Sequence, residues 1–167
     1  MTTLHATPYN LDVKGFYFES EDEFITKMEG LTDKYGIPVE EFEIQFIDGD
    51  DWELFEKAGI TQATISIWFD DIEPLTNYEK LGVFFLLDQG NGLDYALSHF
   101  EDAGIQEGTL EDVSAELFDD CYAHKIPETL RYYIDYGMFA RDQEISGELV
   151  EFKYNGTTYT CINANFI

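Results

Sequence analysis

The most constraining feature of this sequence is a large negative charge spread along the whole chain. Asp and Glu together number 35 against 9 Lys plus Arg, which gives a formal net charge of −26. Self-repulsion of this size destabilises a compact state. The chain is nevertheless 44% hydrophobic and 16% aromatic, which is enough apolar material for folded cores. We therefore expect a folded protein whose surface charge has been selected.

The acidic residues recur in clusters rather than gathering in one tail. The predicted acidic surface consists of Glu19, Glu21, Asp22, Glu41, Glu43, Asp48, Asp50, Asp51, Asp70, Asp71, Glu73, Glu101, Asp102, Glu111, Asp112, Glu116, Asp119 and Asp120. One interpretation is the solvated surface of a highly soluble or salt-adapted protein. The other is imitation of DNA phosphates. B-DNA carries one charge per ~1.7 Å of axis, so the net charge corresponds to roughly 45 Å of duplex. Such a protein would occupy a basic DNA-binding groove and would itself repel nucleic acid.

Local patterns predict an α+β fold, beginning with a small sheet-plus-helix part over residues 1–60. Residues 2–6 and 14–18 are typical of short strands. Ser20-Glu-Asp-Glu23 is a capping box, with Ser20 as the N-cap of a helix and Glu23 three residues later.

The end of this first part predicts a third strand and a second helix. Residues 41–48 alternate between apolar and polar side chains, as a half-buried antiparallel strand does. Asp50 or Asp51 is expected to cap a short helix with Trp52 and Phe55 directed inward.

The middle part, residues 61–103, is predicted to be helical. Residues 61–72 are ambiguous because apolar side chains alternate there as in a strand, and we predict a helix because Pro74 follows as a helix end would. Residues 78–87 and 93–100 have clearer helical spacing.

The last part, residues 104–167, is predicted to combine helices with a hairpin. Thr109 is expected to cap a helix to about Ala123 with Cys121 on its inward face. The segment 148–163 is the clearest hairpin, because Asn155-Gly156 favours a type I′ turn between two strand-like flanks.

The cysteines and the hydropathy pattern indicate a soluble protein. Cys121 and Cys161 lie far apart and form no C-x-x-C motif, so we expect two small buried residues in a reducing compartment. The N-terminus shows no signal-peptide pattern, and no apolar run reaches membrane-spanning length. We expect a cytoplasmic location and no contact with a membrane.

Motifs for catalysis and for cofactors are absent. The segment that starts at Asp48 lacks the Gly and the Glu of a calcium loop, and Gly90-Asn-Gly92 lacks the third glycine of a dinucleotide site. There is no Walker lysine, no H-E-x-x-H and no G-x-S-x-G. No catalytic residue, metal ligand or cofactor is therefore predicted. With so many acids, paired carboxylates have no specificity as a signal. A carboxylate- or metal-dependent hydrolase, and an acidic module for another basic partner, remain as alternatives.

One segment differs from the acidic chain around it. Leu130-Arg-Tyr-Tyr-Ile-Asp-Tyr-Gly-Met-Phe-Ala-Arg-Asp142 resembles the antirestriction motif of the ArdA family, and departs from the family pattern at Ile134, Gly137 and, just beyond, Gln143. The residues that carry the resemblance are Leu130, Arg131, Tyr132, Tyr133, Asp135, Tyr136, Phe139, Ala140, Arg141 and Asp142.

This resemblance implies a function and an architecture. ArdA proteins are products of mobile genetic elements that inhibit type I restriction-modification enzymes by imitating bent B-DNA, without being enzymes. The resemblance implies an elongated line of three small subdomains, a homodimer, and the methyltransferase core of the enzyme as the partner, so that both restriction and modification are affected. The three parts predicted from local pattern agree with that layout.

The motif residues themselves have a structural interpretation. Tyr132, Tyr133, Tyr136 and Phe139 are expected to be core or dimer-contact aromatics rather than target-binding ones. Arg131 and Arg141 are expected to pair with Asp135 or Asp142, which would make Asp135, Asp142 and Glu144 structural partners rather than phosphate substitutes.

Overall fold

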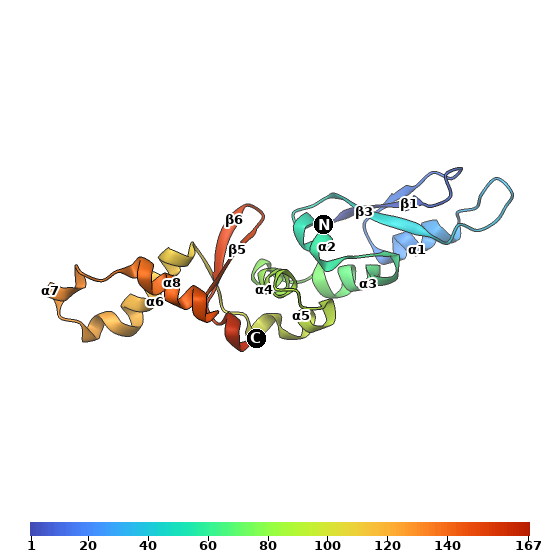
Figure 1. Ribbon diagram of the computed structural model, residues 1–167. Helices are drawn as coiled ribbons and strands as arrows, with labels where there is room; N and C mark the ends of the chain where they lie inside the picture. Colours follow the sequence, from blue (N-terminus) through green and yellow to red (C-terminus); the bar gives the residue numbers. More distant parts are fainter. The chain divides into compact units, whose positions relative to one another are not determined.

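The computed structural model describes residues 1–167 and groups them into two compact units (Figure 1). The N-terminal unit comprises Met1–Lys80 and the C-terminal unit Leu81–Ile167, with the boundary inside helix α4 (Asn77–Asp88). Each unit has a three-stranded sheet and several helices, so the α+β prediction is confirmed. The division into three parts stays a prediction. No helix combines the length and the apolar character that crossing a membrane requires.

The N-terminal unit is built on a sheet with the strand order β2-β1-β3. Its elements are β1 (Thr3–Pro8), β2 (Phe16–Phe18), α1 (Glu21–Glu29), β3 (Phe42–Asp48), α2 (Trp52–Ala58), the 3₁₀ turn η1 (Gln62–Thr64), α3 (Ile65–Ile67) and the π-helical turn η2 (Trp68–Ile72). Both neighbours of β1 run antiparallel to it, with Ala6 opposite Phe16 on one side and Ile44 on the other. The three strands predicted in this part are therefore confirmed.

Aromatic side chains fill the space between this sheet and α1. Phe18 and Phe24 are buried with ring centroids 5.1 Å apart, and Phe24 meets Phe42 edge-on at 5.9 Å. The alternation along β3 is confirmed, since Phe42 is buried and Glu43 is exposed. Such aromatic pairs contribute beyond the area that they bury.

A second cluster in this unit explains why residues 61–72 are helical, as predicted. Ile65, Trp68 and Ile72 are buried, and their spacing of three and four residues is that of one helix face. The Trp68 ring packs edge-on against Phe55 at 4.9 Å.

The expectation that Trp52 is directed inward was wrong. It is 51% exposed, because α2 presents Leu54 and Phe55 to the core and Trp52 stands at the helix start.

The C-terminal unit contains a second antiparallel sheet, with the strand order β4-β6-β5. Its elements after α4 are α5 (Leu93–His99), the 3₁₀ turn η3 (Phe100–Asp102), β4 (Ile105–Glu107), α6 (Leu110–Tyr122), the 3₁₀ turn η4 (Ala123–Lys125), α7 (Glu128–Arg131), α8 (Tyr136–Ser146), β5 (Val150–Tyr154), β6 (Thr157–Cys161) and the 3₁₀ turn η5 (Ala164–Phe166). Asn155 and Gly156 have φ values of 48° and 77°. A type I′ turn requires positive φ at both positions, so the hairpin prediction is confirmed.

The core of this unit lies between α4 and the hairpin. Val83, Phe85 and Leu86 are buried. The Phe85 ring lies 5.2 Å from that of Phe152, and Phe84 lies 4.7 Å from Tyr154.

Helix α6 begins as the sequence predicts. The Thr109 hydroxyl accepts a hydrogen bond from the Asp112 N–H at 3.2 Å. The expectation that Cys121 is buried was wrong, because the far half of α6 presents Phe118 and Tyr122 to α8 and leaves Cys121 exposed. Cys161 is buried as expected, and desolvation raises the pKa of its thiol.

A mostly buried ion pair within the N-terminal unit joins Asp51, the N-cap residue of α2, to Lys80 in the first turn of α4. Lys80 Nζ lies 2.7 Å from Asp51 Oδ2, with side chains 9% and 16% exposed. Removing one partner of such a pair leaves the other charge desolvated and uncompensated.

We predict that Lys80→Met lowers the free energy of unfolding by about 3 kcal/mol, the lower end of the range for breaking a buried ion pair. Urea denaturation measures this change. The matched control is Lys34→Met, which removes a 2.7 Å pair with Asp12 whose side chains are 58% and 59% exposed. The control should change stability by less than about 1 kcal/mol. Equal losses in the two variants would contradict the structural role of the Lys80 pair.

Candidate functional site

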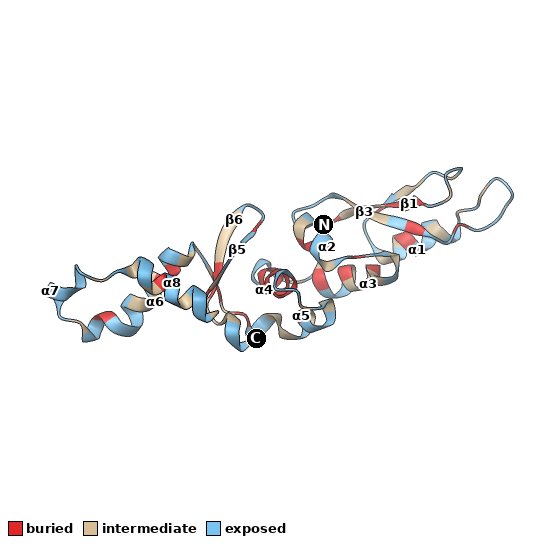
Figure 2. Ribbon diagram, viewed as in Figure 1, coloured by how far each residue is buried: buried red, intermediate tan, exposed pale blue.

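The predicted acidic surface is largely solvent-exposed in both units (Figure 2). The exposed members are Glu19, Asp22, Glu41, Glu43, Asp48, Asp50, Asp70, Asp71, Glu101, Asp102, Glu111, Asp112, Glu116, Asp119 and Asp120. The half-buried members are Glu21, Asp51 and Glu73. We call the exposed set the acidic surface from here on.

Three of these acids stand where the backbone itself favours negative charge. Asp22 lies in the first turn of α1, and Glu111 and Asp112 lie in that of α6. The unpaired N–H groups and the dipole at a helix N-terminus stabilise anions. Local structure therefore offsets part of the self-repulsion without using cations.

Two of the half-buried acids hold the fold together. Asp51 pairs with Lys80. Glu73 Oε1 accepts the Thr2 N–H at 2.7 Å and lies 4.0 Å from the N-terminal ammonium. These two carboxylates are occupied by partners within the protein, so we do not count them with the acidic surface.

Hydrogen bonds also keep two further carboxyl groups ionised. The Lys27 ammonium, 2.6 Å from Glu23, together with the Glu19 N–H, holds the pKa of Glu23 below its usual value. The backbone and hydroxyl of Thr76 lower the pKa of Glu79 in the same way. A carboxyl that acts as a general acid at neutral pH needs a raised pKa, and both of these shifts run in the opposite direction.

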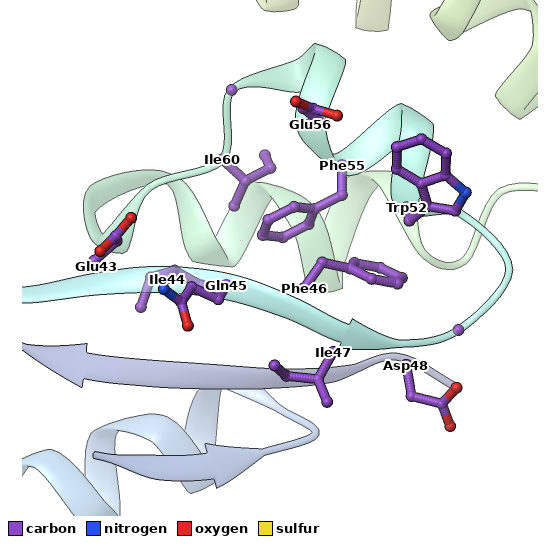
Figure 3. A pocket seen from close by; sticks show the side chains of 12 residues that line it. Glu43, Ile44, Gln45, Phe46, Ile47, Asp48, Trp52, Phe55, Glu56 and Ile60 are labelled. Atoms are coloured by element: carbon purple, nitrogen blue, oxygen red, sulfur yellow. The ribbon is translucent and has the colours of Figure 1, made fainter. Parts of the chain in front are cut away.

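The surface has three notable concavities. One of about 710 Å³ lies between β3 and α2 and contains Trp52 and Phe55 (Figure 3). One of about 550 Å³ has Arg141, Glu111, Glu144 and Glu151 in its lining. One of about 300 Å³ is lined by Phe69 together with Glu19, Ser20, Glu21, Asp22, Asp70 and Glu73. No group of three or more His, Cys, Asp and Glu side chains is arranged to hold a metal ion.

The segment 130–142 forms a turn between α7 and α8 and the first part of α8. Leu130, Tyr132 and Tyr133 are exposed by 53%, 91% and 79%. Asp135 is the N-cap of α8, and its carboxylate accepts the Met138 N–H at 2.9 Å. Ala140 is buried, whereas Arg141 and Asp142 are exposed.

Two aromatics of this segment pack against α6. The Phe118 ring lies 5.1 Å from Phe139 and 5.6 Å from Tyr136, edge-on in both cases. The Tyr136 hydroxyl donates to Asp119 Oδ1 at 2.7 Å. This hydrogen bond to a carboxylate raises the pKa of Tyr136. Tyr136 and Phe139 thus join α8 to α6, while Tyr132 and Tyr133 do not take part in this packing.

The expected arginine pairs are not formed. The Arg131 guanidinium instead donates to the carbonyl oxygens of Ala123 at 2.7 Å and Ile126 at 3.5 Å. Asp135 is occupied by its capping hydrogen bond. Asp142 follows Arg141 directly in α8, and adjacent helical residues do not face each other. Arg141 lies instead in the 550 Å³ concavity beside Glu111, Glu144 and Glu151.

The sequence analysis missed the groove between β3 and α2. A signal was present in the strand alternation, because Ile47 follows Glu43 and Gln45 on the polar face of β3. Ile47 is 49% exposed and, with Trp52, adds apolar surface to an otherwise acidic rim.

We predict that moderate salt stabilises this protein against heat. Raising the ionic strength from about 0.01 M to about 0.15 M shortens the Debye length from roughly 30 Å to roughly 8 Å, which screens repulsion among the exposed acids. The melting temperature measured by calorimetry should rise by several degrees. A steady fall over the same range would contradict the view that self-repulsion dominates the electrostatics.

The chain matches a known protein family over most of its length. A family model described as "Antirestriction protein (ArdA)" matches residues 17–157, which is most of the chain and includes the segment 130–142. Searches of curated proteins and of solved structures found no significant match. The matched region contains the whole acidic surface, whereas β1 and most of β6, the central strands of the two sheets, lie outside it. This chain belongs to the ArdA family of antirestriction proteins.

Proposed function

We propose that this protein inhibits type I restriction-modification enzymes by presenting its acidic surface to their DNA-binding groove as an imitation of B-DNA. Family membership supports an antirestriction function and a restriction-modification enzyme as the partner. The charge supports the mechanism, since −26 corresponds to roughly 45 Å of duplex. We further propose that the protein acts as a binding inhibitor without catalysis, in the cytoplasm where the enzyme meets DNA.

The observation that carries this proposal is the charge spacing on α6. Glu111, Asp112, Glu116, Asp119 and Asp120 are all exposed on this helix. A helix rises about 1.5 Å per residue, so these five carboxylates span about 13.5 Å, with a mean axial interval of about 3.4 Å. One strand of B-DNA carries one phosphate per ~3.4 Å of axis. The linear charge density of α6 therefore matches that of a single DNA strand.

The groove of a DNA-binding enzyme is basic, and its cations are arranged for phosphates. Carboxylates at phosphate density would be steered to it by long-range attraction and held there by ion pairs. Because type I enzymes bind DNA through their methyltransferase core, we propose that core as the docking site, with modification as well as restriction inhibited.

We also propose that the protein acts as a homodimer through the exposed apolar side chains around α7 and α8. Leu130, Tyr132, Tyr133, Met138 and Ile145 are exposed by more than half. Large exposed apolar patches mark association surfaces, and tyrosine is enriched in them. Two copies would double the length of DNA imitated. An elongated arrangement of three subdomains in each copy is part of this proposal.

The inhibitory mechanism is tested by neutralising acids on α6. We predict that the triple variant Glu111→Gln, Glu116→Gln and Asp120→Asn inhibits DNA cleavage by a type I enzyme about tenfold more weakly at low salt, because each exposed ion pair contributes roughly 0.2–1 kcal/mol. The difference should shrink as salt rises. These three residues are chosen because the carboxylates of Asp112 and Asp119 also accept hydrogen bonds within the fold, from the Thr109 and Tyr136 hydroxyls.

The matched control removes the same charge from exposed acids that lie outside the acidic surface and away from α7 and α8, with Glu29→Gln, Glu107→Gln and Asp94→Asn. It should retain most of the inhibition. If the control loses as much as the α6 variant, net charge rather than the surface on α6 determines inhibition. If neither variant loses inhibition at low salt, the proposed mechanism is wrong.

The dimer is tested by truncating the two exposed tyrosines. We predict that Tyr132→Ala with Tyr133→Ala shifts the protein from dimer to monomer in sedimentation velocity, because two aromatic anchors leave the interface. The control is Tyr9→Ala with Tyr35→Ala, two tyrosines in the N-terminal unit exposed by 66% and 76%. A double variant at 132 and 133 that sediments like the wild type would rule out this interface.

A further inference from the structure

Strand β3 forms an edge of the sheet in the N-terminal unit. In the order β2-β1-β3 it pairs with β1 on one side only. In an antiparallel ladder, successive residues direct their backbone N–H and C=O groups to opposite edges. The Tyr9 N–H donates to the Glu41 carbonyl, whereas the Phe42 N–H points the other way and donates to the Gln62 side chain at 2.9 Å. By this alternation the backbone groups of Ile44 and Phe46 face the edge away from β1.

The groove described above runs along this same edge. Its lining includes every residue from Glu43 to Gly49, together with Trp52, Phe55 and Ile60 from α2 and the residues after it. Figure 3 shows Phe46 and Phe55 pointing into the space between β3 and α2, with Trp52 at one end. Phe55 and Ile60 form a buried floor, while Trp52 remains half exposed. An unpaired strand edge beside an apolar groove is the geometry that accepts an added strand.

The charges around the groove indicate what kind of segment fits. Glu43, Asp48 and Glu56 line it, and no Lys, Arg or His does. Side chains on an added strand alternate between two faces. On one face they would meet Phe46, Phe55 and Ile60, which favours apolar residues. On the other they would lie opposite Glu43, where a cationic residue forms a favourable cross-strand pair. The face of Trp52 also attracts cations.

A second copy of this chain does not fit the groove. Pairing of two β3 edges would bring Glu43, Asp48 and Glu56 of both copies to one seam, and like charges close together on a sheet are destabilising. The occupant is therefore a segment other than β3 of a second copy.

We propose that β3 accepts an extended protein segment of alternating cationic and apolar residues as a fourth strand of the N-terminal sheet. This binding would recognise a polypeptide backbone rather than a DNA-binding groove. It therefore goes beyond the imitation of DNA and does not depend on it.

The test uses a peptide of about seven residues, the length of β3, that alternates lysine with valine or isoleucine. Amide NMR spectra of the full chain are recorded during its addition, and tryptophan fluorescence is followed in parallel, in which Trp52 is the one exposed tryptophan because Trp68 is fully buried. The amides of Ile44 and Phe46 should shift and become protected from hydrogen exchange, and Trp52 emission should move to shorter wavelength. Perturbations spread evenly over the acidic surface, with none at β3, would overturn the proposal.

Backbone pairing is separated from simple charge attraction by two N-methylated peptides. Each has the parent sequence and charge but carries N-methyl groups on one of the two alternate sets of residues. A strand paired along one edge uses only one set of its N–H groups. One methylated peptide should therefore bind at least about tenfold more weakly, through loss of several hydrogen bonds, while the other retains the parent affinity. If the two peptides bind alike, strongly or weakly, pairing along one edge is excluded.

The groove itself is tested with Trp52→Ala, an exposed position whose truncation spares the core. The parent peptide should bind this variant several-fold more weakly, because apolar and cation–π contacts are lost. The control Tyr9→Ala removes another exposed aromatic of the same unit and should leave the affinity unchanged. Equal affinities for both variants would contradict the assigned groove.

Discussion

The fold depends on aromatic cores that outweigh the mutual repulsion of the acidic residues. A chain with a net charge of −26 gains little from ion pairing, since it has only 9 Lys and Arg in all. Stability must come from apolar burial and ring packing. Each unit supplies its own aromatic cluster, around Phe24 and Trp68 in the first and around Phe85 and Phe152 in the second. The Lys80–Asp51 pair is where one of the scarce cations is buried.

Because apolar burial rather than ion pairing stabilises the fold, most carboxylates are not needed to hold it together. Helix N-termini and short local hydrogen bonds support some of them, and Glu73, Asp51 and Asp119 are among those that join one element to another. In the function that we propose, these exposed carboxylates take the place of phosphates on a DNA backbone. The arginines of the motif fit the same picture. The Arg131 guanidinium is held by backbone carbonyls, and Arg141 shares a concavity with three glutamates that offset its charge.

Much of the fold was predictable because its signals are local. The capping residues Ser20 and Thr109, the alternation along β3 and the Asn155-Gly156 turn each specify their element within a few residues. The failures concern contacts between elements. Cys121 and Trp52 were assigned to the core by spacing alone, but the packing of α6 on α8 and of α2 on the sheet decided otherwise. Arg131 was expected to pair with a carboxylate. Its guanidinium instead donates hydrogen bonds to backbone carbonyls in the turn that follows α6.

The functional surface was predictable in composition and less so in geometry. The clusters of acids are visible in the sequence, and most are exposed as a solvated or phosphate-like surface requires. The spacing of the acids could be calculated only once the bounds of α6 were known. The groove beside β3 depends on how α2 packs against that strand, which no local sequence pattern specifies. Ile47 on the polar face of β3 was the one local sign of it.

The most direct test of the account is competition for a type I methyltransferase core. A fluorescent duplex that contains the recognition site is bound to the enzyme, and the protein is added at moderate salt while anisotropy is recorded. Imitation of DNA predicts that anisotropy falls to the value of free duplex near one equivalent of inhibitor per DNA site, because the two ligands exclude each other. Anisotropy that stays high or increases while the protein binds the enzyme would show that both are held at once, and would contradict the account.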